Sequence, residues 1–165
     1  MTQFADIKER FRAREKVVMV AMAGDLLAEH ESLSEELDAA LAATRTSLAD
    51  GTSTQQLAER IAQLEADIED SRVPFRFRGL GRNTYKTLER AHPDPDGGAW
   101  NVETFPAALV AACSLDPVMS AEQVAELVDM VTEGEFGRLF QAAFAACNDA
   151  NDVPFNGRAS MVTQR

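Results

Sequence analysis

The chain has 165 residues, of which 45% are hydrophobic, so it is long enough to bury the core of one domain. Its formal net charge of -11 repels phosphate backbones, which argues against nucleic acid as a partner. No apolar run approaches the ~20 residues of a membrane-spanning helix and the N-terminus is polar, so we expect no membrane partner and no secretion.

The N-terminal segment combines an amphipathic pattern with an excess of basic residues. Residues 3–15 predict a short helix in which Phe4, Ile7 and Phe11 share one face. Such a helix either packs on its own domain or acts as an arm that binds a partner. The apolar, partly β-branched run at 17–22 then predicts a strand.

Two helical segments follow and predict a hairpin over residues 25–70. The first carries leucines at spacings of seven and four, and Ser53 or Thr54 is placed to cap the second. The apolar seam of the second helix has the four-three-four rhythm of a coiled coil and consists of Leu57, Ile61, Leu64 and Ile68. The hairpin is either an intramolecular element that protrudes from the domain or a dimerisation arm.

Residues 73–78 alternate apolar and basic side chains and predict a half-buried strand. An antiparallel pair with 17–22 would place the helical hairpin between the two strands. The fold class that follows is mainly α with a small two-stranded antiparallel β element, an α+β arrangement.

The C-terminal half predicts a helical bundle. Helices are expected over 83–91, 104–115 and two further segments, with Thr104 as one N-cap. Capping boxes begin at Ser120 and at Thr132.

We therefore predict a single domain over 1–150. Its parts are the hairpin at 25–70 and a helical C-terminal part at 79–150. Residues 151–165 lack periodicity and predict a flexible tail.

No pattern in the chain indicates catalysis or a cofactor. Cys113 and Cys147 both lie in Ala-rich helical segments, where buried thiols behave as small apolar residues, with a disulfide or redox pair as the alternative. The only histidines are His30 and His92, too few for a zinc site, and the loop after Asp94 lacks the later ligands of a calcium loop. We expect no catalytic residues, no cofactor, no metal and no enzyme activity.

Apolar surface is the remaining candidate for function. Phe136, Phe140 and Phe144 recur every four residues and form one stripe of a helix, which is either core or partly exposed. The candidate partner-binding residues are Trp100, Phe105, Leu109, Phe136, Phe140 and Phe144.

The order of features from residue 73 to 148 resembles the tail assembly chaperones of long-tailed bacteriophages of actinobacteria. The features are the strand at 73–78, a turn ending in Gly81-Arg82, a helix ending in His92-Pro93, a helix start at Thr104-Phe105-Pro106, and a closing Phe- and Ala-rich helix ending in Asn148. The first 72 residues fit the family only loosely.

The resemblance implies a protein that binds the tape measure protein and keeps it soluble while the tail tube polymerises. It also implies contact with the tail tube protein and with a longer, frameshifted form of the chain itself. Such a protein works in the host bacterial cytoplasm during assembly and is not expected in the mature virion. The alternatives are a structural tail or neck protein of the virion and an acidic inhibitor that mimics DNA.

Overall fold

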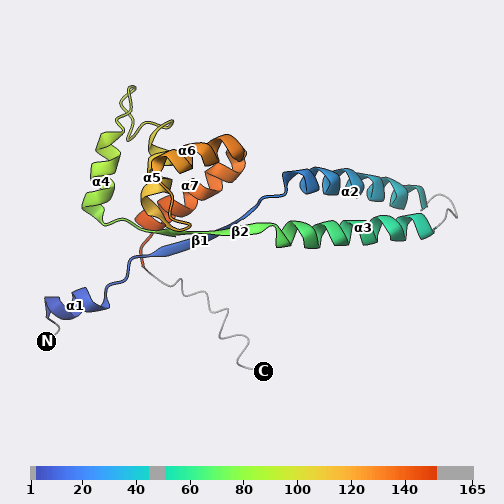
Figure 1. Cartoon of the computed structure of the whole chain (residues 1–165), viewed down its shortest axis with the longest axis horizontal. Helices are drawn as coiled ribbons and strands as arrows, with labels where there is room; N and C mark the ends of the chain where they lie inside the picture. Colours follow the sequence, from blue (N-terminus) through green and yellow to red (C-terminus); the bar gives the residue numbers. More distant parts are fainter. Residues whose placement is uncertain (1–2, 45–50, 152–165) are drawn as a thin grey trace. The chain divides into compact units, whose positions relative to one another are not determined.

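A computed structural model describes residues 3–44 and 51–151 of the chain (Figure 1). The predicted flexible tail, 151–165, lies outside the described residues except for Asn151. The chain forms two compact units. One unit contains Met1–Val17 and Arg76–Arg165, and the other contains Val18–Phe75.

The described chain is mostly helical with a small antiparallel sheet, which confirms the α+β class. The sheet has three strands in the order β1-β2-β3, rather than the two that were predicted. The strands are β1 (Glu15–Ala21), β2 (Arg72–Arg78) and β3 (Ser114–Asp116). The third strand was missed because three residues are too short to show an alternating pattern, and because they follow a helix directly.

The unit Val18–Phe75 contains the helices α2 (Gly24–Thr44) and α3 (Gly51–Asp70), which follow β1 and precede β2 in the chain. The predicted cap at Ser53 or Thr54 is wrong, because α3 already begins at Gly51. Ile61, Leu64 and Ile68 are buried against α2, so the predicted seam of α3 is its packing face.

Polar contacts between α2 and α3 reinforce this packing at the surface. Both Nε and Nη2 of Arg60 donate to Glu29 Oε1, at 3.1 and 2.7 Å. His30 Nε2 lies 3.3 Å from Glu65 Oε1. Because these side chains are largely solvated, each pair stabilises the hairpin by at most about 1 kcal/mol.

The other unit contains the C-terminal helices, which are α4 (Arg82–Ala91), α5 (Phe105–Cys113), α6 (Ala121–Met130) and α7 (Glu133–Asn148). Both predicted capping boxes are present. Ser120 accepts from the Gln123 backbone N–H, and Thr132 accepts from that of Glu135.

Strands β2 and β3 are antiparallel in this unit. Arg76 pairs with Asp116 and Phe77 pairs with Ser114, so the strand register shifts between Arg76 and Phe77.

The N-terminal helix α1 (Phe4–Arg10) is shorter than predicted and β1 begins at Glu15. The apolar face of this segment is open to solvent, since Phe4 is 69% exposed and Phe11 is 66% exposed. The expectation that this helix packs on its own domain is therefore not supported by the described contacts, and a partner-binding arm remains the alternative.

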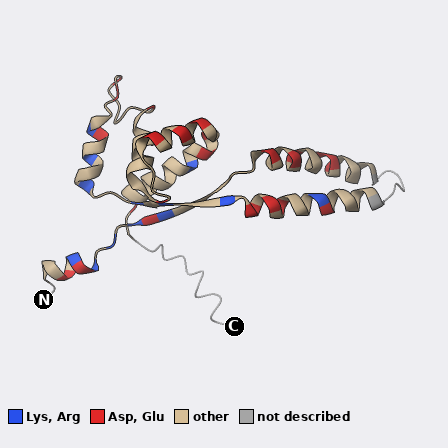
Figure 2. Cartoon of the chain, viewed as in Figure 1, with Lys and Arg blue, Asp and Glu red and all other residues tan. Residues whose placement is uncertain are grey.

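Acidic residues occur along α2, α3 and α6 (Figure 2), which agrees with the acidic balance of the whole sequence. On α6 they are Glu122, Glu126 and Asp129. Among the helices in the described ranges, none combines the length and the apolar character needed to cross a bilayer.

A close backbone approach joins the end of β2 to α7. A Cβ added at Gly79 would lie 2.1 Å from the carbonyl oxygen of Ala146, a distance that real Cβ atoms do not adopt. The Gly79 N–H donates to Arg14 O at 2.8 Å, which holds this residue beside the start of β1. Position 79 therefore requires glycine, because a larger residue would clash with the Ala146 carbonyl.

Replacing Gly79 by alanine should lower the free energy of unfolding by about 2 kcal/mol or more, because backbone atoms must shift to admit the methyl group. Thermal denaturation followed by circular dichroism measures the loss. Gly137→Ala is the matched control, since Gly137 has open space at its Cβ position within α7. It should be neutral or stabilising by up to about 1 kcal/mol. Equal effects of the two variants would contradict the close approach.

Candidate functional site

Aromatic rings from α4, α5, α7 and the loop before α5 meet around Phe105, which is fully buried. The Phe105 ring lies 4.8 Å from Trp100 and 5.9 Å from Tyr85, measured between ring centroids. Trp100 also contacts Phe140 at 5.6 Å, and Phe140 contacts Phe144 at 5.7 Å. We call this set of rings the aromatic cluster. Its tilted and edge-on geometries are the favourable ones for aromatic pairs.

Trp100 is held in the cluster by a loop that is ordered around Asp94. The carboxylate of Asp94 accepts from the backbone N–H of Gly98 at 2.6 Å and from that of Asp96 at 3.2 Å. Gly97 has a φ of 84°, a conformation that side chains other than glycine rarely adopt. The Asp94 carboxylate thus organises the turn that precedes Trp100.

Thr104 is the N-cap residue of α5, as predicted, but its side chain makes no capping hydrogen bond, and Asn101 orders the turn that leads into the helix. Asn101 Oδ1 accepts from the backbone N–H groups of Glu103 and Thr104, at 2.8 and 3.1 Å. The Thr104 hydroxyl is instead hydrogen-bonded to His92 Nδ1 at 2.9 Å. The Asn101 N–H donates to His92 O, so the end of α4 is tied to the start of α5. Asn101 therefore positions Phe105 and Trp100 together.

The phenylalanines of α7 flank its buried face without forming it. The fully or nearly buried residues of this helix are Leu139, Ala143 and Ala146. Phe136, Phe140 and Phe144 are each partly exposed. The stripe is consequently neither pure core nor free surface, and its rings are accessible from one side.

A surface groove of about 420 Å³ lies between α4 and α7, with Trp100 on its wall. Its lining residues are Arg82, Tyr85, Lys86, Glu89, Ala99, Trp100, Phe144, Cys147 and Asn148. Its volume lies in the range of ligand pockets, and it is lined by the buried ring of Tyr85 and the partly exposed rings of Trp100 and Phe144. We call it the Trp100 groove.

Charged side chains at the rim of the Trp100 groove are partly paired. Lys86 Nζ lies 2.6 Å from Glu89 Oε2 and 5.9 Å from the centroid of the Tyr85 ring. Burial raises the pKa of the Tyr85 hydroxyl above its ordinary value, partly opposed by a hydrogen bond with Asn148. Tyr85 is thus a neutral apolar wall for this groove at physiological pH. Such a site is suited to an apolar side chain surrounded by polar groups.

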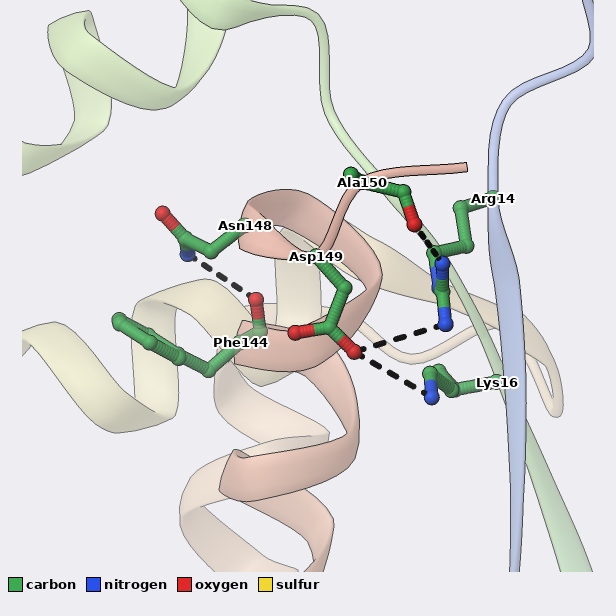
Figure 3. Close-up of polar contacts among 6 residues, drawn as sticks. All are labelled: Arg14, Lys16, Phe144, Asn148, Asp149 and Ala150. Carbon is green, nitrogen blue, oxygen red and sulfur yellow. Dashed lines mark hydrogen bonds and ion pairs between the residues drawn. The ribbon is translucent and has the colours of Figure 1, made fainter. Parts of the chain in front are cut away.

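The end of α7, below the groove, is clamped to the start of β1 (Figure 3). Asp149 Oδ2 lies 3.5 Å from Arg14 Nη2 and 3.4 Å from Lys16 Nζ. Arg14 also donates to the carbonyl of Ala150. Asn148 Nδ2 donates to Phe144 O at 3.0 Å, which closes the last turn of the helix. These contacts fix the turn that carries Phe144.

Of the six predicted partner-binding residues, Trp100 and Phe144 line the groove, and Phe140 joins them through its ring contacts. Phe105 and Leu109 are fully buried in α5, and the Phe105 ring packs against Tyr85 and Trp100 of the groove. Phe136 is partly exposed, one turn before Phe140.

Sequence reasoning missed the groove residues outside the apolar stripe, notably Tyr85, Lys86 and Cys147. Their positions depend on packing α4 beside α7, two segments about sixty residues apart in the chain. The one signal available was that Tyr85 is an aromatic residue within the predicted helix 83–91.

Within 3–44 and 51–151, no group of three or more His, Cys, Asp or Glu side chains is placed to hold a metal ion. Comparisons with protein-family models, with curated proteins and with solved structures found no match for this chain.

Replacing Asp94 by alanine should release the loop that carries Trp100, since two backbone N–H groups lose their acceptor. We expect a loss of about 1–2 kcal/mol in stability. The emission of Trp100, the single tryptophan, should shift to longer wavelength and become more easily quenched by acrylamide. Asp96→Ala is the control, because Asp96 contributes its backbone N–H to this network. A spectrum of Asp94→Ala identical to that of the control would contradict the assigned role.

Proposed function

We propose that the protein is a phage tail assembly chaperone that binds the tape measure protein and keeps it soluble while the tail tube polymerises. The resemblance of residues 73–148 suggests the family. The observation that carries the proposal is the Trp100 groove, a partly exposed aromatic surface within that same segment.

The groove suits the chemistry of such a client. A tape measure protein presents long amphipathic helices whose apolar faces lack a partner until the tube encloses them. A groove lined by Trp100, Tyr85 and Phe144 can take an apolar side chain from such a helix. The proposed role requires binding weak enough for tube subunits to displace the chaperone.

The acidic balance of the chain supports the same role. A net charge of -11 keeps a protein with exposed rings from associating with itself. It also disfavours nucleic acid as a partner.

Further parts of the proposal follow from the resemblance. The protein is not an enzyme, acts in the host bacterial cytoplasm during assembly, and has neither nucleic acid nor membrane as a partner. The tail tube protein and a frameshifted longer form are its other partners. The helical hairpin inserted between β1 and β2 and the C-terminal helical bundle are then separate parts of one chaperone, and client binding resides in the bundle.

Co-expression with the cognate tape measure protein tests the proposal. The wild-type chain should move the tape measure protein from the pellet to the soluble fraction and co-purify with it. Phe144→Ala should weaken the complex by about 2 kcal/mol, roughly thirtyfold, because an aromatic contact at the centre of the groove is lost.

Met130→Ala provides the matched control, since Met130 is an apolar residue on α6 that is 80% exposed and outside the groove. It should leave rescue unchanged. Circular dichroism of each variant alone shows whether it is folded. If both variants rescue equally, the groove is not the binding site. If the wild-type chain rescues nothing, the function itself is wrong. Stoichiometric protein in purified virions would favour the alternative, a structural tail or neck protein.

A further inference from the structure

We infer that Cys113 and Cys147 form a dithiol site that closes reversibly to a disulfide by exchange with a small disulfide such as oxidised glutathione. This inference is independent of the proposed function.

Geometry is the first support for the site. The Sγ atoms of Cys113 and Cys147 lie 3.4 Å apart, although the residues are 34 positions apart in the chain. A disulfide bond has an S–S distance of about 2.05 Å, so the two sulfurs need to approach by only a little over 1 Å. The two cysteines belong to α5 and α7, which pack directly on each other. Small side-chain rotations can therefore form the bond.

The two sulfurs differ in their exposure to solvent, and we infer that they therefore have different roles in the exchange. Cys113 is 2% exposed, whereas Cys147 is partly exposed and lines the Trp100 groove. Cys147 also lines a second, smaller pocket of about 180 Å³ beside Gly79 and Leu80. A small disulfide in solvent can thus reach Cys147 first, and Cys113 only through it.

Hydrogen bonds favour the thiolate at Cys147. The backbone N–H of Leu80 donates to Cys147 Sγ at 3.3 Å. The hydrogen bond from the Cys113 thiol, together with that N–H, lowers the pKa of Cys147 to about 7. The same hydrogen bond, with burial, raises the pKa of Cys113 above its usual range. The accessible sulfur is therefore the nucleophile and the buried one stays protonated until exchange begins.

The exchange proceeds in two balanced steps. The Cys147 thiolate attacks one sulfur of the small disulfide, forms a mixed disulfide, and releases the first small thiolate. Cys113 then gives its proton to that thiolate or to water. The Cys113 sulfur attacks the Cys147 sulfur, breaks the mixed disulfide, and releases the second small thiolate. The protein loses two electrons and the small disulfide is reduced to two thiols.

The closed site would tie the end of α5 to the last turn of α7, the same turn that carries Phe144. Joining residues 34 positions apart restricts the unfolded chain. The melting temperature should therefore rise by roughly 5–15 °C on oxidation and return when dithiothreitol is added.

The test exposes the full chain to oxidised glutathione and measures intact mass and non-reduced peptide maps. The expected product has lost two hydrogen atoms and yields one cross-linked peptide pair that contains Cys113 and Cys147. A stable glutathione adduct on Cys147, a covalent dimer, or two unmodified thiols would each overturn the inference.

Single variants separate the two roles. Cys113→Ala should stop at the glutathione adduct on Cys147, and Cys147→Ala should react little, because its remaining thiol is buried. In Cys113→Ala the alkylation of Cys147 at pH 7 should slow by roughly tenfold, since its hydrogen-bond donor is gone. An unchanged rate would overturn the assigned roles. If Cys113→Ala does not fold, Cys113→Ser takes its place in the adduct measurement only, because a serine hydroxyl can still donate a hydrogen bond to Cys147.

Discussion

Phe105 is fully buried at the start of α5, and rings from α4 and the loop before α5 pack against it. The position of Trp100 depends on this packing and on the hydrogen bonds of Asp94 and Asn101, which order the backbone of the loop. Trp100 in turn contacts Phe140 of α7. The buried Phe105 ring thus contacts α4 directly and α7 through Trp100, and the rings of Trp100, Phe140 and Phe144 remain partly exposed. The site proposed for an apolar partner therefore consists of the outer rings of this aromatic packing.

The last turn of α7 is where several constraints meet. Gly79 lies against its Ala146 carbonyl, and the ion pairs of Asp149 hold its end to the start of β1. Phe144 and Cys147 are both on this turn and both line the Trp100 groove. The turn that places Phe144 in the groove also brings the Cys147 sulfur to 3.4 Å from that of Cys113. The proposed client binding and the proposed disulfide formation would therefore depend on the same turn of α7.

Features that depend on residues close together in the sequence were predictable, and features that depend on the packing of distant segments were not. The capping boxes at Ser120 and Thr132 need only residues three positions apart, and both are present. Thr104 was predicted correctly as the N-cap of α5, but its hydroxyl is hydrogen-bonded to His92 and not to the helix backbone, a contact that no local pattern shows. Periodicity identified α7 but not its buried face, since alanines and phenylalanines repeat at the same spacing. The Trp100 groove depends on distant packing, which no local pattern encodes.

The fluorescence of Trp100 during titration with the cognate tape measure protein tests the central claim most directly, because the chain has a single tryptophan. If a client side chain enters the Trp100 groove, the emission should shift to shorter wavelength and acrylamide quenching should fall as the complex forms. Co-sedimentation measures the complex independently. A complex that forms while the emission and the quenching of Trp100 stay unchanged would contradict the account.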